Sequence, residues 1–210
     1  MRHTILKFKQ SGLLRADRGD GFVFGALRKV EQAMTSQEES HLGNTPRPNV
    51  EIDIALNTEL VDLAKPFKAV FHRAFDDVLG EASALTGTQK VEVDRKALEI
   101  VKSCGFDGIL TSGGPGNAPN NADRLAGIVR MASRRRVDER LEIIVGGGVR
   151  SGNISGLMAR LAVGDDDADE SEGKSDIWFH SSCLSTRNRM LGFDGGEVRG
   201  LVAELAQVDM

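Results

Sequence analysis

Four short apolar runs, each followed by a cluster of polar residues, dominate the pattern of this chain. Each run has four to six residues, is rich in β-branched or aromatic side chains, and lacks the 3.6-residue period of an amphipathic helix. Such runs are typical of strands that are buried on both faces of a parallel sheet. The four segments are Lys68–Asp77 (KAVFHRAFDD), Asp107–Gly116 (DGILTSGGPG), Leu141–Arg150 (LEIIVGGGVR) and Asp176–Cys183 (DIWFHSSC).

Stretches with helical spacing separate these runs, so strand, polar loop and helix follow one another repeatedly. Five strands are predicted, at Gly21–Leu27, Ala69–His72, Gly108–Thr111, Leu141–Val145 and Ile177–His180. Six helices are predicted, at Ile5–Leu14, Val50–Ala64, Asp94–Ser103, Ala122–Arg134, Asn153–Leu161 and Gly196–Val208. Five strand–helix units indicate an α/β protein with a single domain over residues 1–210. The count is compatible with an open doubly wound sheet and with part of a (β/α)₈ barrel.

Local signals refine the ends of these elements and the loops between them. Gly105 is predicted to end one helix and Ser151 to cap another. The segments 32–49 and 78–91 are predicted to be polar loops. The acidic segment 164–175 (GDDDADESEGKS) is predicted to be a disordered insert, because its carboxylates lack the spacing of an EF-hand calcium loop.

Composition and charge exclude several classes of function. The 210 residues are 40% hydrophobic and 28% charged, and the formal net charge is -4. An acidic chain of this kind predicts neither nucleic-acid binding nor attraction to an anionic membrane surface. No apolar segment approaches the ~20 residues that span a bilayer. The two cysteines, Cys104 and Cys183, do not resemble a disulfide framework, which indicates an intracellular protein with reduced thiols.

Polar residues at the ends of parallel strands are expected to meet on one face, where such folds carry their chemistry. His72, Arg73 and Asp76 follow one strand and are candidate catalytic residues. Histidine can act as an acid or a base near neutral pH, and arginine can hold an anion through two parallel hydrogen bonds. The alternative is an ion pair between Arg73 and Asp76 that only supports the fold.

The next loops suggest an anion site. Glycines with positive φ let backbone amides turn toward a ligand, and the start of a helix favours negative charge. A tight turn that simply needs glycine is the alternative. The candidate anion-binding residues are Thr111, Ser112, Gly113, Gly146, Gly147, Gly148, Ser151, His180 and Ser181.

Two residues at the end of the last strand are candidate metal ligands. His180 and Cys183 offer one nitrogen and one sulfur ligand, and sulfur suits Cu(I). Cys104 precedes a strand and is therefore expected on the opposite face. The ordinary alternative for Cys183 is a small buried apolar side chain.

Four of these segments together resemble the CutC family of copper homeostasis proteins. They are FHRAFD (Phe71–Asp76), ILTSG (Ile109–Gly113), GGGVR (Gly146–Arg150) and FHSS (Phe179–Ser182), in the family's order and with similar gaps. The resemblance implies a TIM-like barrel, a cytoplasmic location and copper as the ion that is bound or handled.

The resemblance also implies that about three N-terminal strand–helix units of the family are missing, so that about five of eight are present. Five parallel strands cannot close a barrel, and two edge strands would expose unpaired backbone groups. A homo-oligomer formed through the open sheet edge is therefore predicted. Three functions follow as alternatives: a CutC-type protein that handles copper, a barrel enzyme that acts on a small phosphorylated or carboxylated molecule, and an inactive remnant.

Overall fold

A five-stranded parallel sheet is the central element of the computed structural model, which describes residues 1–30, 50–81, 87–133, 141–162, 177–184 and 192–207. The α/β class and the parallel sheet are thereby confirmed. The two outer strands, β1 and β7, do not pair with each other, so the described part of the chain forms an open sheet and the TIM-like barrel is not confirmed. The strands lie in the order β1 (Gly21–Phe24), β4 (Lys68–Phe71), β5 (Gly108–Thr111), β6 (Glu142–Gly146) and β7 (Ile177–His180).

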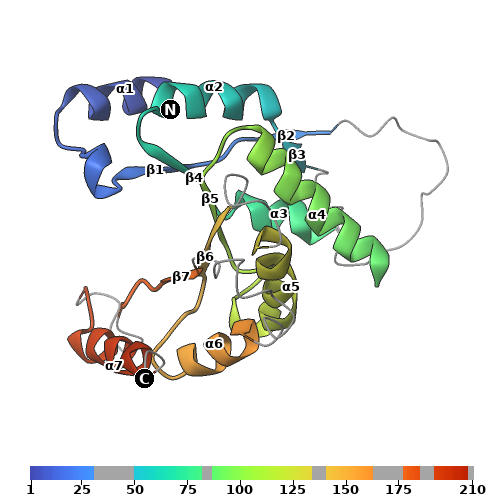
Figure 1. The fold of residues 1–210 in the computed structure, drawn as a ribbon, viewed down its shortest axis with the longest axis vertical. Helices are drawn as coiled ribbons and strands as arrows, with labels where there is room; N and C mark the ends of the chain where they lie inside the picture. The colour runs from blue at the N-terminus through green and yellow to red at the C-terminus, as the bar shows by residue number, and fades with distance from the viewer. Residues whose placement is uncertain (31–49, 82–86, 134–140, 163–176, 185–191, 208–210) are drawn as a thin grey trace, which may run out of the picture.

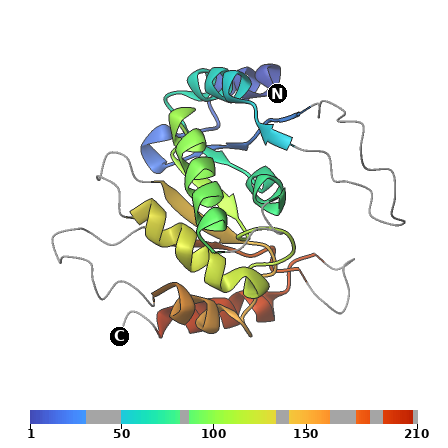
Figure 2. The same cartoon turned by 90° about the vertical axis from the view of Figure 1, so that its right-hand side faces the viewer.

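Helices alternate with these strands along the chain. Figure 1 shows α3, α4 and α5 on one side of the sheet, with α1 and α2 at one end of the molecule and α6 and α7 at the other; Figure 2 shows the same order from the side. The helices are α1 (Arg2–Gln10), α2 (Ile54–Ala64), α3 (Ala74–Glu81), α4 (Thr88–Ser103), α5 (Ala122–Ser133), α6 (Ile154–Ala162) and α7 (Gly195–Ala206), with short 3₁₀ turns at Ala16–Arg18 and Pro119–Asn121.

The hydrophobic core lies between the helices and one face of the sheet. Residues paired across parallel strands point to the same side, so Phe24, Phe71, Ile109 and Ile143 form one row. Each of the four is exposed by 3% or less. The ring of Phe106 packs against this row, with its centroid 5.2 Å from that of Phe71. Because the strands are held by this core, the positions of their carboxyl ends are fixed relative to one another.

The first predicted strand is shorter than expected. It ends at Phe24, and Leu27 already belongs to β2 (Leu27–Lys29), which pairs antiparallel with β3 (Val50–Ile52) in a separate two-stranded sheet. The prediction of a helix from Val50 is therefore corrected, since the helix begins only at Ile54. A side chain outside the apolar pattern holds the chain between β1 and β2: the buried Asn57 amide donates to the Ala26 carbonyl at 2.8 Å and accepts from the Ala26 N–H at 2.9 Å.

The loop predicted over 78–91 is also corrected. Helix α3 continues to Glu81 and α4 begins at Thr88, and of the residues between them only 82–86 are undescribed. The apolar positions Phe75, Val78 and Leu79 have helical spacing and pack inward. The first turns of α4 are exposed and polar, which is why the sequence pattern did not reveal them.

Several predicted helix ends are confirmed or moved by a few residues. Gly105 does end α4, with φ +89 and its N–H bonded to the Lys102 carbonyl at 2.8 Å. Helix α1 ends at Gln10, before the predicted Leu14. The expectations for 32–49, 164–175, Arg134 and Val208 fall outside the described residues.

Candidate functional site

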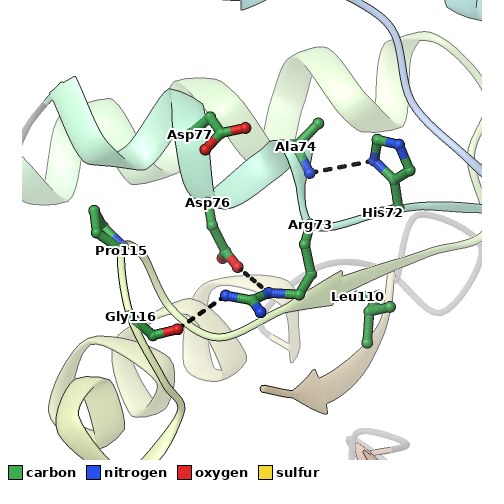
Figure 3. A pocket seen from close by; sticks show the side chains of 8 residues that line it. All are labelled: His72, Arg73, Ala74, Asp76, Asp77, Leu110, Pro115 and Gly116. Atoms are coloured by element: carbon green, nitrogen blue, oxygen red, sulfur yellow. Dashed lines mark hydrogen bonds and ion pairs between the residues drawn. The ribbon is translucent and has the colours of Figure 1, made fainter. Parts of the chain in front are cut away.

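The carboxyl ends of β4 and β5 border a cavity of about 660 Å³. Figure 3 shows its lining side chains, which come from the segment after β4, from β5 and from the loop that follows β5. Its lining residues are His72, Arg73, Ala74, Asp76, Asp77, Leu110, Pro115 and Gly116. The three candidate catalytic residues therefore all lie at one cavity.

Asp76 is the buried centre of this site. Its side chain is 5% exposed and accepts hydrogen bonds from four residues. The hydroxyl of Thr111 donates at 2.5 Å and that of Ser112 at 2.8 Å; the backbone N–H groups of Ser112 and Gly114 donate at 3.0 Å and 3.2 Å, and Arg73 Nε donates at 2.7 Å. A carboxylate that is surrounded by donors in this way fixes the loop after β5.

Arg73 connects the ends of three neighbouring strands. Besides its bond to Asp76, its Nη2 donates to Ser112 Oγ at 2.7 Å and to the Gly116 carbonyl at 3.0 Å. Its Nη1 has no hydrogen-bond acceptor among the described residues and lies beside Gly147 after β6, where a Cβ atom would come within 3.1 Å of it. The absence of a side chain at Gly147 therefore lets the guanidinium reach the glycine loop.

His72 has one ring nitrogen engaged. Its Nδ1 accepts a hydrogen bond from the Ala74 N–H at 3.2 Å, which Figure 3 marks. In the neutral ring the proton is therefore on Nε2. Asp76 does not bond to this ring among the described residues; it forms the ion pair with Arg73 that the sequence offered as the alternative, and it also bonds to the β5 loop.

The structure gives Thr111, Ser112 and Gly113 a supporting position. Thr111 and Ser112 are fully buried, and both hydroxyls bond to Asp76. Gly113 has φ +78 and packs against Leu125, where a Cβ would come within 2.7 Å of a side-chain carbon. None of the three is among the residues that line the cavity, and the two hydroxyls hold Asp76 in place, while their contact with a ligand stays a prediction.

The glycine segment after β6 meets the loop after β7. Gly147 and Gly148 both have positive φ, as the sequence predicted, and Gly146 lies close to His180 on β7. Arg150 donates to Ser181 Oγ at 3.0 Å and to Ser182 Oγ at 3.2 Å, which joins the two loops. The glycine segment is thus flanked by Arg73 on one side and by Arg150 on the other.

Ser151 occupies a different position from the one predicted. Its hydroxyl and its N–H donate to the carboxylate of Glu197 on α7, at 2.8 Å and 2.7 Å. Within the described residues it caps no amide of α6. Because both Ser151 groups bond to Glu197, they link the segment before α6 to α7.

The two cysteines are free and lie in different surroundings. Cys183 is half-buried, follows β7 and has φ 47, which is uncommon for a residue with a side chain. Cys104 is buried at the end of α4, and burial raises the pKa of its thiol. Within the described residues, no three histidine, cysteine, aspartate or glutamate side chains gather as a ligand set for a metal ion.

The sequence interpretation did not single out several residues of the site, among them Leu110, Asp77 and Arg150. Leu110 and Asp77 line the cavity, and Arg150 joins the last two loops. Arg150 directly follows the glycine segment, so its position was a usable signal. Leu110 carried no signal, because an apolar residue inside a strand reads as core.

The fold and the site together define a class: an α/β protein with a parallel sheet and a polar, arginine-containing cavity at the carboxyl ends of its strands. None of the described helices has the length and apolar character needed to cross a membrane. Residues 27–169 match the model of the CutC family. The chain belongs to the CutC family.

Individual relatives agree with this assignment. A protein of Caulobacter vibrioides named family protein CutC is 37% identical over 115 residues, which are 55% of this chain and 40% of that protein. The human "Copper homeostasis protein cutC homolog" is 27% identical over 179 residues, 85% of this chain and 47% of the human protein. The matched chain thus spans less than half the length of either relative. A crystal structure of the putative copper homeostasis protein CutC from Streptococcus agalactiae aligns with a TM-score of 0.42 and 22% identity, over 61% of this chain and 49% of that one.

Proposed function

We propose that the cavity after β4 and β5 binds a small phosphorylated or carboxylated molecule, with Arg73 as the residue that holds its negative charge. One observation carries this proposal: Nη1 of a guanidinium that is otherwise anchored has no acceptor within the described chain and lies against the glycine segment. A guanidinium that is already oriented loses little freedom on binding an anion. In this proposal His72, with its proton on Nε2, is the acid or base of the same cavity.

Protection against heat tests this function. Inorganic phosphate or succinate at about 100 times its dissociation constant should stabilise the protein by about 2.7 kcal/mol, which corresponds to a rise in Tm of roughly 5–10 °C. Arg73→Gln should lose most of this rise, because the anion loses its charged partner. The measurement is the shift in Tm with ligand concentration, which separates binding from any change in stability of the unliganded variant.

Arg160→Gln is the matched control, since Arg160 is an exposed arginine that pairs with Asp123 on the surface, away from the cavity. It should keep the full shift. Equal protection of wild type and Arg73→Gln would contradict the proposal.

A second candidate is the binding of Cu(I) near the end of β7, as the names of the human and mouse relatives suggest for those proteins. The observation that favours it here is the partly accessible thiol of Cys183, three residues after His180 at the same end of the sheet. Thiolate and imidazole are suitable ligands for Cu(I). Free cysteines also support the proposal that the protein works in the reducing cytoplasm.

An anaerobic Cu(I) competition assay distinguishes the two thiols. Cys183→Ser should weaken Cu(I) binding by at least about tenfold, because the partly accessible sulfur ligand is lost. Cys104→Ser should leave it unchanged, because the Cys104 thiol is buried at the end of α4 and its raised pKa disfavours the thiolate. Binding by wild type that is no tighter than by a free thiol such as glutathione would refute a copper site.

A further inference from the structure

Exposed apolar side chains concentrate at the two edges of the open sheet. Among the described residues, six of the large exposed hydrophobic side chains lie in residues 1–30 and six in residues 177–207, while only Ile54 and Val91 lie between. The first group is Met1, Leu6, Phe8, Leu13, Val23 and Val30, and the second is Trp178, Leu184, Phe193, Val198, Val202 and Leu205. The interior strands and helices bury their apolar residues, so the exposed ones belong almost entirely to the first and last units.

The edge strands expose these side chains on one common face. The pairing registers place Val23 of β1 and Trp178 of β7 on the same side as Leu110 and Ile144, opposite to the row of Phe71. Val23 and Trp178 are each 58% exposed, whereas Leu110 and Ile144 are half-buried. All-parallel sheets normally have both faces covered. In the described part of the chain, the helices α3, α4 and α5 cover only the other face (Figure 1).

We propose that two copies of this chain form a two-fold dimer in which β7 of each copy pairs, in parallel, with β1 of the other. A two-fold axis that runs along the strands preserves strand direction, so both junctions are parallel like the rest of the sheet. The edges have equal lengths of four residues, and both carry an exposed apolar side chain on the uncovered face. The dimer leaves neither sheet with an open edge and encloses Val23 and Trp178 in a ten-stranded barrel.

A second copy of the chain is the occupant that these edges fit best. The terminal helices α1 and α7 lie at opposite ends of the molecule in both views, so neither of these two helices reaches the other edge of the same copy (Figures 1 and 2). In the dimer α1 of one copy lies beside α7 of the other, and apolar side chains of both helices cover each other. The dimer also shields one wall of the cavity from solvent, because the lining residue Leu110 points to the face that the partner encloses.

The mass of the protein in solution and the fluorescence of Trp178 test the dimer directly. Sedimentation of the full chain should give twice the 22.7 kDa mass of one chain. Trp178 is the single tryptophan of the sequence, so its emission reports on this edge alone. The emission maximum should lie at short wavelength in the dimer and shift to longer wavelength on dilution, at the concentration where the mass halves.

Two edge variants and a matched control test the pairing. Val23→Lys and Trp178→Glu should each raise the dissociation constant of the dimer at least about 100-fold, because each places unpaired charges at both junctions. Val91→Glu changes a side chain of α4 that is 55% exposed, away from the edges, and should leave the dimer intact. A mixture of Val23→Lys and Trp178→Glu should regain dimers, since the mixed dimer has one unaltered junction and one where opposite charges face each other.

The outcomes are decisive in either direction. A monomer at about 100 µM, an assembly larger than two chains, or a mixture without recovery would overturn the proposal. If only one edge variant dissociates, that edge pairs with itself and the β1–β7 junction is wrong. Circular dichroism establishes that each variant is folded; should Trp178→Glu fail to fold, Val23→Lys and the dilution shift of the wild-type emission decide the question. Phosphate and copper are absent from these measurements, so their result is independent of ligand binding.

Discussion

Replacing Asp76 with alanine is expected to lower the free energy of unfolding by about 3–5 kcal/mol, because it leaves several buried hydrogen-bond donors without an acceptor, at about 1–3 kcal/mol each. The carboxylate accepts from Arg73, Thr111, Ser112 and Gly114, and it is 5% exposed. Without it, the Thr111 hydroxyl and the backbone N–H groups of Ser112 and Gly114 lose their acceptor inside the protein, while the Ser112 hydroxyl keeps the Gly114 carbonyl at 2.8 Å. For a chain of this length the fall in Tm is roughly 6–20 °C.

Asp77→Ala is the matched control for this prediction. Asp77 is the next residue of α3 and lines the same cavity, but its side chain is exposed. Its replacement should change the unfolding free energy by less than about 0.5 kcal/mol. Urea unfolding followed by circular dichroism measures both variants. Equal stability of Asp76→Ala and wild type would mean that the buried hydrogen bonds around Asp76 do not form in solution.

The ion pair between Arg124 and Asp94 is expected to give the second large effect. Their side chains are only 10% and 5% exposed, and Arg124 also donates to the Leu79 carbonyl at 3.1 Å. Arg124→Ala should destabilise the protein by about 3–5 kcal/mol, because it leaves the Asp94 carboxylate buried without its partner. The guanidinium also lies close to Gly114, where a Cβ atom would come within 3.1 Å of it. We therefore expect Arg124→Ala to weaken protection by phosphate as well.

A second variant separates the cost of an unpaired charge from the net value of the pair. The double variant Asp94→Leu/Arg124→Met should be substantially more stable than Arg124→Ala, since apolar residues of similar size can replace a buried pair. The exposed pair of Arg160 and Asp123 is the control: Arg160→Ala should cost about 0–1 kcal/mol. If Arg124→Ala lowers the free energy of unfolding as little as Arg160→Ala does, the buried ion pair matters no more for stability than the exposed one, and the prediction is wrong.

Much of the fold could be predicted because its signals are local. Strands β4, β5, β6 and β7 were found within one residue of their ends, since each is a short apolar run that stops at a polar cluster. The helix from Val50 was predicted wrongly because its true start depends on Asp53, which caps α2 by accepting from the Leu56 N–H at 3.0 Å. Because Asp53 lies between apolar residues and does not interrupt their spacing, the hydrophobic periodicity did not reveal that β3 ends and α2 begins there.

The candidate site was predicted in part for a related reason. Parallel strands bring their carboxyl ends to one edge, so the meeting of His72, Arg73 and the glycine segment followed from the order of elements. The separate roles of the residues within the site could not be predicted from the order of the elements. Thr111 and Ser112 look like ligand contacts in the sequence, yet both are buried against Asp76, and Ser151 is bonded to α7 instead of the cavity.

The sequence by itself determined the α/β class, the strands whose carboxyl ends carry the candidate site residues, and the membership in the CutC family. These depend on residue types and spacing along the chain, which act over a few neighbouring residues. Only the tertiary structure decided which polar groups support the site, which guanidinium nitrogen has no acceptor among the described residues, and which apolar side chains are exposed at β1 and β7. Those properties depend on partners such as Asp76 and Ser112, which are 36 residues apart in the chain and meet only once the sheet has formed.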